Sequence, residues 1–292
     1  MYTAYNQIRS KLCDLVMQLS EKEGAEFKDI AQKWYDTYFD TKANEKASED
    51  MLAAVSKSKS PLAKEIMKQK QFLSKKSIWI FGGDGWAYDI GFGGLDHVIA
   101  SGEDVNILVF DTEVYSNTGG QSSKSTPIGA VAQFAAAGKA TKKKDLAQIA
   151  MSYGYVYVAQ VAMGSDYSQC VKAFAEAESY HGPSIIIAYA PCINHGIKGG
   201  MNDTQKVMKQ AVAAGYWQTF RFDPRLKDQG KNPFTLDSKA PTMEYNDFIM
   251  NEVRYSSLTL SFPDRAKELF EKAKQAAKDK YDYLQKYAKL YE

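Results

Sequence analysis

Residues 77–121 read SIWIFGGDGWAYDIGFGGLDHVIASGEDVNILVFDTEVYSNTGGQ, and this stretch decides the fold. Its order predicts a buried strand, a Gly-Asp-Gly turn, a helix, a second buried strand and a polar loop that ends in Ser116-Asn117. In open parallel sheets, ligands bind beyond the carboxyl ends of the strands, where the turn and the loop would both lie. The stretch therefore predicts a site for a phosphorylated cofactor with a divalent metal.

The sequence beyond this stretch continues the alternation of strand and helix. The predicted strands are 77–81, 105–111, 155–161, 184–189 and 216–222, and the predicted helices between them are 89–101, 146–153, 167–179 and 203–214. Strands that are apolar on both faces and alternate with helices are typical of α/β proteins. We therefore expect a parallel open sheet with helices on both faces.

The flanking segments are helical in pattern. Residues 1–73 carry apolar positions at helical spacing but no side chains suited to a site, so they predict a helical arm or cap. Residues 74–222 are the predicted α/β domain. Residues 223–292 are expected to form an irregular loop and a C-terminal helical extension. Because the chain begins directly in helix-like sequence, we expect it to be a piece of something longer.

Composition excludes several classes of protein. Of the 292 residues, 45% are hydrophobic, which is enough for a sizeable core. The formal net charge of +2 gives no case for nucleic-acid binding, and no apolar run reaches the roughly 18 residues of a membrane span. The three cysteines are far apart and include no CxxC pair, which favours a reducing, cytoplasmic setting.

The first predicted loop is Gly82-Gly83-Asp84-Gly85. Glycines let the backbone turn sharply and approach a phosphate closely, and the start of the next helix would face the same anion. Asp84 cannot bind a phosphate directly, because like charges repel. It can instead bind a metal ion that bridges to the phosphates.

The second predicted loop supplies further oxygen ligands. The Thr112 hydroxyl, a nearby backbone carbonyl and the Asn117 amide are hard donors of the kind that Mg²⁺ prefers. The alternative is that the Gly-Asp-Gly is only a turn and Asn117 only a loop cap. The combination is more specific than either part, because Asn117 follows Gly85 by 32 residues and stands at the end of the next strand.

The amino-acid sequences of five segments resemble those of a known family. They are FGGDGWAYDIGFGGLDHV, NILVFDTEVYSNTGGQSSKSTP, GAVAQFAAAGK, KKKDLAQIAMSYGYVYVAQVAMG and AYAPCINHGI. Together they are similar to the C-terminal thiamine-diphosphate-binding domain of the pyruvate:ferredoxin (flavodoxin) oxidoreductase family, over roughly residues 70–260. The Gly-Asp-Gly motif followed by asparagine is the part shared with thiamine-diphosphate enzymes in general.

The resemblance implies roles for individual residues. Asp84, the Thr112 side chain and the Val114 carbonyl would bind Mg²⁺. Asn117 would lie near the reacting carbon and influence catalysis, which moves it from metal ligand toward substrate. The residues implied to contact thiamine diphosphate are Gly83, Asp84, Gly85, Trp86, Thr112, Glu113, Val114, Tyr115, Ser116 and Asn117.

The cysteines divide into one candidate ligand and two packing residues. Cys192 follows the predicted strand 184–189, so it should lie at the same sheet edge as both loops. A single cysteine is more often a small buried hydrophobe, but the resemblance implies that Cys192 is one of four ligands of a [4Fe–4S] cluster. Cys13 and Cys170 do not match the other three ligands, which would come from outside this chain.

Two other groups of polar residues have plain interpretations. His195 follows Cys192 by three residues, but too few further ligands are found for a zinc site. Lys142, Lys143 and Lys144 are expected to form a solvated face, with contact to an acidic redox partner as the alternative.

The resemblance implies a 2-oxoacid (pyruvate):ferredoxin or flavodoxin oxidoreductase, which converts pyruvate and coenzyme A to acetyl-CoA and CO₂ and passes electrons to iron–sulfur clusters. The implied partners are the remaining domains or chains of the same enzyme, ferredoxin or flavodoxin, and a second copy in a homodimer; neither nucleic acid nor a membrane is expected. This chain alone is expected to be inactive. The alternatives are a non-oxidative thiamine-dependent decarboxylase or synthase subunit and a non-catalytic interaction module.

Overall fold

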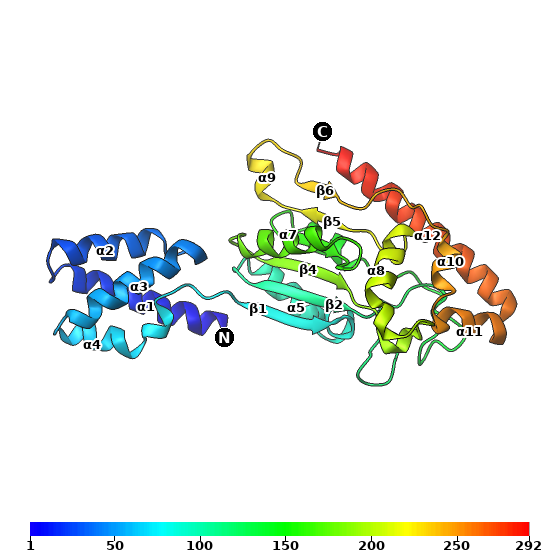
Figure 1. The fold of residues 1–292 in the computed structure, drawn as a ribbon, viewed down its shortest axis with the longest axis horizontal. Helices are drawn as coiled ribbons and strands as arrows, with labels where there is room; N and C mark the ends of the chain where they lie inside the picture. Colours follow the sequence, from blue (N-terminus) through cyan, green and yellow to red (C-terminus); the bar gives the residue numbers. More distant parts are fainter. Residues whose placement is uncertain (292) are drawn as a thin grey trace. The chain divides into compact units, whose positions relative to one another are not determined.

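The computed structural model describes residues 1–291, and the chain divides into two compact units, Met1–Ile78 and the part that begins at Trp79 (Figure 1). The second unit contains both the sheet and the C-terminal helices. Residues 223–291, part of the segment expected as a separate extension, therefore pack within the same compact unit as the sheet. No helix among the described residues is long and apolar enough to span a membrane.

The first unit is a small helical bundle with its own apolar core. Its elements are α1 Tyr2–Ser20, α2 Ala25–Asp36, α3 Thr41–Lys57, α4 Pro61–Lys68 and the short 3-10 helix η1 Lys70–Phe72. The helical spacing of Leu12, Val16 and Leu19 lines up one face of α1, and all three side chains are fully buried. Helix α4 begins where the Ser60 hydroxyl accepts the Leu62 amide and Pro61 occupies the first turn.

The second unit is built on one six-stranded sheet. Its strands are β1 Trp79–Gly83, β2 Asn106–Asp111, β3 Tyr157–Val161, β4 Ser184–Tyr189, β5 Phe220–Phe222 and β6 Phe234–Leu236, in the order β1-β2-β4-β3-β5-β6. The first four strands are parallel. The predicted parallel core and its open α/β architecture are confirmed.

The last two strands differ from the expectation. Both β5 and β6 are antiparallel to their neighbours, so the complete sheet is mixed. Residues 216–222 form a strand only over their last three positions, and β6 lies within the segment expected to be irregular. A three-residue strand is too short to carry the apolar periodicity on which the sequence argument depends.

The remaining elements cover the sheet from both faces. They are the π-helix η2 Gly85–Ile90, the 3-10 helices η3 Ile193–His195 and η4 Met201–Asp203, and the α-helices α5 Phe92–Ala100, α6 Leu146–Met151, α7 Tyr167–Glu178, α8 Thr204–Ala213, α9 Arg225–Asp228, α10 Tyr245–Ile249, α11 Val253–Ser261 and α12 Pro263–Lys289.

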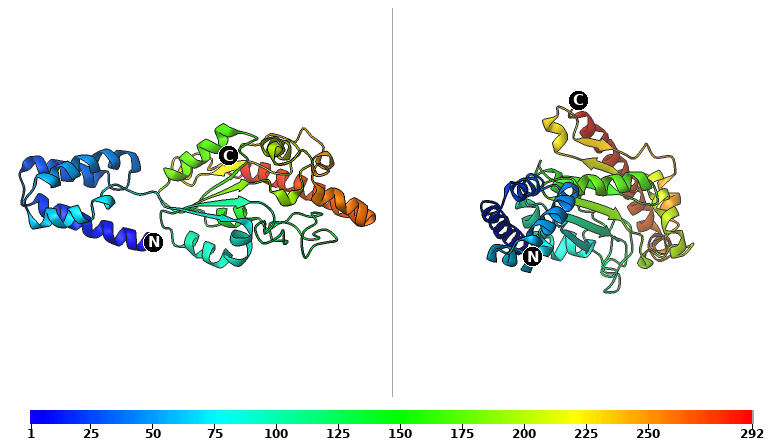
Figure 2. Two further views of the ribbon diagram at one scale, coloured as in Figure 1. Left: turned by 60° about the horizontal axis from the view of Figure 1, so that its bottom comes forward. Right: turned by 60° about the vertical axis from the view of Figure 1, so that its left-hand side comes forward.

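Alternate side chains of β2 enter two different cores. Ile107 and Val109 join the larger core with α5, α11 and α12, whereas Leu108 joins the smaller core beneath α7. Figure 2 shows α5 and α7 on opposite faces of the sheet. Because β1, β2 and β4 are parallel neighbours, their carboxyl ends lie at one edge of the sheet, where the predicted loops begin.

Candidate functional site

The two predicted loops meet because β1 and β2 are parallel neighbours in register. Gly83, the last residue of β1, pairs with Phe110 near the end of β2. The residues that follow the two strand ends then lie side by side, which places Asp84 next to Thr112. Strand β4 pairs with β2 on its other side, with Tyr189 opposite Asp111, so the segment that contains Cys192 starts at the same edge.

The Asp84 carboxylate is the centre of this edge. It is 1% exposed, and its Oδ1 accepts hydrogen bonds from Thr112 Oγ1 at 2.8 Å and Thr112 N at 3.2 Å. Its Oδ2 accepts hydrogen bonds from Ser123 Oγ at 2.6 Å and Ser125 Oγ at 2.7 Å. All these donors are neutral, and Asp84 forms no ion pair with a described residue. A buried carboxylate with only neutral partners suits a bound cation.

Three kinds of oxygen converge here. Thr112 Oγ1 lies 2.8 Å from Asp84 Oδ1 and 3.0 Å from the Val114 carbonyl oxygen. A hydroxyl has one hydrogen and can donate it to only one of these two acceptors. Carboxylate, hydroxyl and carbonyl oxygens are the ligand set that Mg²⁺ prefers. The three predicted metal ligands are therefore brought together by the fold.

Close backbone approach explains the glycines of the turn. A β-carbon on Gly85 would lie 2.4 Å from the Tyr115 ring, and one on Gly82 would lie 2.2 Å from the Trp86 ring. The helix expected from residue 89 is preceded by the π-helix η2, which begins at Gly85, while α5 itself begins at Phe92. The turn thus packs directly on the second loop and on its own following tryptophan.

The outer part of the second loop is open to solvent. Asn117 is exposed and makes no hydrogen bond with a described residue. Tyr115 and Ser116 are partly buried, and the loop is closed by hydrogen bonds from Tyr115 N to the Gln121 carbonyl and from Gly120 N to the Tyr115 carbonyl. The loop is thus held in a compact turn that leaves the Asn117 side chain at the surface.

Glu113 differs from the expectation for a cofactor contact. Its side chain is 1% exposed and turns into the protein, where Lys143 Nζ lies 2.9 Å from Oε1 and an Arg254 guanidinium nitrogen lies 2.7 Å from Oε2. Lys143 also contacts Asp111 Oδ2 at 2.8 Å. The side chain of Glu113 therefore belongs to a buried charge network behind the loop, and only its backbone can face a cofactor.

Burial and charge act against each other in this network. Burial raises the pKa of Asp111, and Lys143 offsets only part of that rise. Burial also acts to raise the pKa of Glu113, but Lys143 and Arg254 together outweigh it and hold the pKa below its ordinary value. Burial acts to lower the pKa of Lys143, whereas Asp111 and Glu113 raise it above normal. Lys143 is thus held as a cation.

The sequence interpretation of the lysine run was wrong for its middle member. The expected solvated face applies to Lys142, which is exposed, but the Lys143 side chain is only 24% exposed and pairs with two buried carboxylates. Arg254 was not singled out at all. Its only local signal is Glu252 two residues earlier, whose Oε2 lies 2.7 Å from Arg254 Nε.

The segment after β4 contacts the second loop at two points. The Asn194 side-chain amide donates to the Ser116 carbonyl at 3.2 Å. The His195 ring, which is fully buried, has its Nε2 2.7 Å from the Thr112 carbonyl. Cys192 is 8% exposed, and its sulfur accepts the Asn194 amide at 3.4 Å.

The other two cysteines belong to helices. Cys13 is part of α1 in the first unit, and Cys170 is buried in α7, in the smaller core that contains Leu108. Within residues 1–291, no group of three or more His, Cys, Asp or Glu side chains is arranged to hold a metal ion. An iron–sulfur cluster at Cys192 would accordingly need thiolates from outside the chain.

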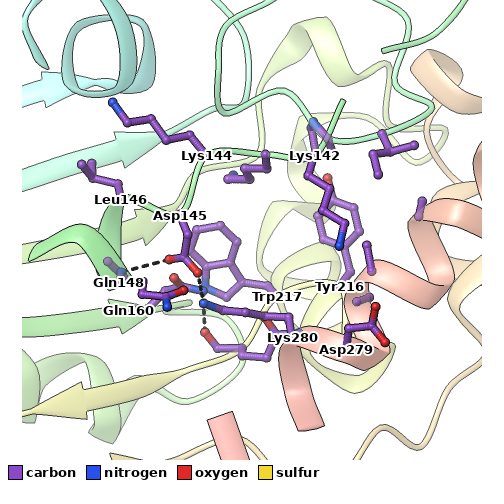
Figure 3. Close-up of a pocket in the computed structure, with 18 of the residues that line it drawn as sticks. Lys142, Lys144, Asp145, Leu146, Gln148, Gln160, Tyr216, Trp217, Asp279 and Lys280 are labelled. Carbon is purple, nitrogen blue, oxygen red and sulfur yellow. Dashed lines mark hydrogen bonds and ion pairs between the residues drawn. The ribbon is translucent and has the colours of Figure 1, made fainter. Parts of the chain in front are cut away.

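Glu113 and Lys143 of the charge network also line a cavity of about 380 Å³, part of whose lining Figure 3 shows. It is bounded by the 142–148 segment, by Trp217 before β5 and by α12, and Asp145 and Lys280 form an ion pair at its wall. Of the predicted site residues, only Glu113 lines it. The cavity is therefore separate from the edge where Asp84 and Thr112 meet.

Comparison with known proteins finds a matching domain family and several close relatives. Residues 66–188 match the model described as thiamine pyrophosphate enzyme, C-terminal TPP binding domain. The chain is 63% identical over 228 residues to a pyruvate:ferredoxin oxidoreductase of Moorella thermoacetica, covering 78% of this chain and 19% of that protein. It is 59% identical over 221 residues to a pyruvate-flavodoxin oxidoreductase of Klebsiella pneumoniae, covering 76% and 19%.

A relative with a different electron acceptor in its name also matches. A mitochondrial pyruvate dehydrogenase [NADP(+)] of Euglena gracilis is 48% identical over 264 residues, covering 89% of this chain and 15% of that protein. The chain thus spans no more than about a fifth of the length of these relatives. The family resemblance seen in the motifs is confirmed. Residues 66–188 match the thiamine pyrophosphate enzyme C-terminal domain, and most of the chain is similar to one segment of pyruvate:ferredoxin and pyruvate-flavodoxin oxidoreductases.

Proposed function

We propose that this chain is the thiamine-diphosphate- and Mg²⁺-binding portion of a 2-oxoacid (pyruvate):ferredoxin or flavodoxin oxidoreductase. The proposal rests on one observation above all: the buried Asp84 carboxylate lies within 3.0 Å of the Thr112 hydroxyl, which in turn lies 3.0 Å from the Val114 carbonyl. These oxygens stand at the carboxyl ends of neighbouring parallel strands, where α/β proteins bind ligands.

The proposed roles follow from the position of each group. Asp84, Thr112 and the Val114 carbonyl hold Mg²⁺, which in turn holds the diphosphate. Gly83 and Gly85 let the backbone approach, while Trp86, Tyr115 and Ser116 line the cofactor. Their part is to orient it, because thiamine diphosphate itself supplies the electron sink that decarboxylation of a 2-oxoacid needs.

The exposed Asn117 amide is the proposed contact near the reacting carbon. Its side chain is exposed and makes no hydrogen bond with a described residue, so it is available to hydrogen-bond a substrate. Its proposed role is to orient the 2-oxoacid, and replacement by alanine should lower turnover more than cofactor affinity.

Cys192 is the proposed ligand of a [4Fe–4S] cluster completed by three thiolates from other parts of the enzyme. Its position at the same edge as Thr112 supports an electron outlet beside the cofactor. Coenzyme A, ferredoxin or flavodoxin, and a second copy in a homodimer are the partners proposed for the complete enzyme, in the cytoplasm. These partners and this location are implied by the family resemblance.

Calorimetry tests the cofactor site directly. The chain is titrated with thiamine diphosphate in the presence of Mg²⁺ and again after EDTA treatment. Binding should require Mg²⁺, and Asp84→Asn should weaken the Mg²⁺-dependent part at least tenfold, because it removes the only charged ligand. The matched control is Asp104→Asn, which makes the same change at the opposite end of β2 and should leave binding unchanged.

Retained Mg²⁺-dependent affinity in Asp84→Asn would overturn the metal assignment. The oxidoreductase itself is tested by combining the chain with the remaining part of a relative and following pyruvate- and coenzyme A-dependent reduction of a viologen dye. Release of CO₂ without dye reduction would instead favour a non-oxidative thiamine-dependent decarboxylase.

A further inference from the structure

Three consecutive residues at the end of β2 point in opposite directions. The Thr112 hydroxyl faces Asp84, whereas the side chains of Asp111 and Glu113 are 0% and 1% exposed and point into the protein. Glu113 stands between Thr112 and Val114, which supply two of the proposed metal ligands. The backbone torsions of Glu113 therefore set the position of the Val114 carbonyl relative to the Thr112 hydroxyl, now 3.0 Å apart.

Glu113 adopts an unfavourable backbone conformation. Its φ is +60°, in the left-handed region. A β-carbon crowds the following carbonyl in this region, which disfavours it by an equilibrium factor of about 5–30 for residues other than glycine. Such a conformation persists only where surrounding contacts impose it.

Those contacts come from two cations on distant segments. Lys143 Nζ bridges Glu113 Oε1 at 2.9 Å and Asp111 Oδ2 at 2.8 Å. Arg254 contacts Glu113 Oε2 at 2.7 Å, and the Tyr216 hydroxyl donates to the same oxygen. Both carboxylate oxygens of Glu113 are thus held, by groups that lie 30 and 141 positions along the chain.

Arg254 is itself fixed in place. Its Nε lies 2.7 Å from Glu252 Oε2, and Arg254 and Glu252 are 3% and 0% exposed. Glu252 Oε1 lies 3.6 Å from His195 Nδ1, and the other ring nitrogen of His195 contacts the Thr112 carbonyl at 2.7 Å. The network therefore also holds the peptide group that precedes Glu113, through the Thr112 carbonyl. The Glu113 carbonyl, in the following peptide group, accepts a hydrogen bond from Thr126 Oγ1 at 2.6 Å.

We propose that Lys143 and Arg254 are positioning residues: by holding the Glu113 carboxylate from two sides, they keep its backbone left-handed and so place the Thr112 hydroxyl and the Val114 carbonyl for the metal ion. The inference deepens the proposed function and rests on it for the identity of the ligand. Neither cation contacts the cofactor, since both lie on the interior side of the loop.

Stability alone is a poor explanation of this arrangement. Buried ion pairs often add little to stability compared with apolar residues of similar size, because desolvation offsets their attraction. An apolar cluster would support the loop equally well but would place no demand on the conformation of Glu113. The left-handed φ is the feature that the charges account for.

The first experiment compares two neighbouring lysines. Lys143→Met keeps the length of the side chain and removes the cation, whereas Lys142→Met makes the same change at an exposed residue without an ion pair among the described residues. Lys143→Met should weaken Mg²⁺-dependent binding of thiamine diphosphate about 5–30-fold. Lys142→Met should leave it unchanged.

Rescue at Glu113 separates positioning from mere stability. In the Lys143→Met background, Glu113→Gly removes the carboxylate that has lost one of its two cations, and glycine accepts a left-handed φ without strain. It should therefore recover most of the lost affinity. Glu113→Ala in the same background removes the same carboxylate but retains a β-carbon, so it should not.

A cofactor-free measurement makes the outcome independent of the proposed function. Amide hydrogen exchange in residues 111–117 reports whether Glu113 N still donates to Asp111 Oδ1 and Thr112 N to its acceptors. Exchange should accelerate in Lys143→Met and slow again with Glu113→Gly but not with Glu113→Ala.

Equal exchange and equal affinity in all variants would overturn the positioning role. Equal recovery by glycine and alanine would also overturn it, since the backbone conformation would then not matter. If the unsubstituted chain binds no thiamine diphosphate but shows the predicted exchange pattern, the proposed function fails and the positioning of the loop stands.

Discussion

Replacing Gly85 by alanine tests whether the Gly-Asp-Gly turn exists for close packing. An added β-carbon would lie 2.4, 2.5 and 2.9 Å from three carbons of the Tyr115 ring, well inside van der Waals contact. The Tyr115 backbone is fixed by hydrogen bonds to Gln121 and Gly120, so only its ring can move. Overpacking of this kind typically costs about 1–3 kcal/mol.

The matched control is the neighbouring glycine. A β-carbon on Gly83 would meet only the Phe110 carbonyl oxygen, at an ordinary 3.9 Å. Alanine also lowers the entropy of the unfolded chain, which favours both variants by about 0.4–1 kcal/mol. The difference between Gly85→Ala and Gly83→Ala therefore isolates the contact with Tyr115.

Calorimetric unfolding of the full chain gives the readout. In a domain of this size, each kcal/mol shifts the melting temperature by about 2–4 °C. We expect Gly85→Ala to lower the transition of the second unit by several degrees and Gly83→Ala to leave it within about two. Equal shifts in the two variants would refute the close-packing argument, as would an unchanged transition in Gly85→Ala.

Three further predictions concern other parts of the chain. The Leu269 side chain in α12 is 2% exposed, so Leu269→Ala should lower the unfolding free energy of the second unit by about 2–5 kcal/mol in thermal unfolding. Leu260 is 86% exposed, and Leu260→Ala should change that free energy by less than about 0.5 kcal/mol. Equal effects would exclude α12 from the core. Trp34→Phe removes the indole N–H that is shared between the Leu73 carbonyl and the Ser48 hydroxyl, and it should lower the unfolding free energy of the first unit by about 1–3 kcal/mol. Tyr35→Phe, at a half-exposed side chain, should leave that free energy unchanged. Burial acts to raise the pKa of Glu252, but Arg254, together with His195, outweighs it and holds the pKa below its ordinary value. The stabilisation by this carboxylate is therefore complete above the unfolded pKa of about 4.3 and is lost as pH falls through the lower, folded pKa. The melting temperature of Glu252→Gln should differ most from that of the parent at pH 7, and the gap should narrow only as pH falls below about 4.3; a gap of unchanged size in strong acid would contradict this.

The sequence was sufficient for the parts of the fold that depend on periodicity. Continuous apolar runs such as 184–189 predicted the buried parallel strands, because such strands meet apolar side chains on both faces. The strand predicted over 216–222 was right only for its last three residues, which form β5. Its middle residue, Arg221, pairs with Glu176 and Asp237 on other elements, and these partners come together only in the folded chain.

The candidate site likewise contains residues that the sequence could predict and residues that it could not. Asp84 and Thr112 could be proposed from the sequence because each directly follows a strand, and parallel neighbours bring such positions together. Lys143 could not be separated from Lys142 and Lys144, since a charge run is usually a solvated face. What distinguishes Lys143 is a pair of buried carboxylates, and burial is a property of the tertiary structure.

The C-terminal helices support both sides of the proposed metal site. On one side, Arg254 at the start of α11 holds Glu113 between Thr112 and Val114. On the other, the loop containing Gly138 packs so closely on α11 and α12 that a β-carbon there would lie 2.8 Å from Leu258 and 3.0 Å from Leu269.

The loop that contains Gly138 is also linked to Asp84 by hydrogen bonds. The next residue, Lys139, donates to the Ser123 carbonyl at 2.6 Å, and the Ser123 hydroxyl donates to Asp84 at 2.6 Å. Two separate paths thus lead from α11 and α12 to the proposed ligands that follow β1 and β2. Because ligands on two different strand ends must be held at a fixed separation for a metal ion with strict geometry, a support shared by both loops keeps them in register with each other. The extension that carried no motif in the sequence is therefore a structural part of the site.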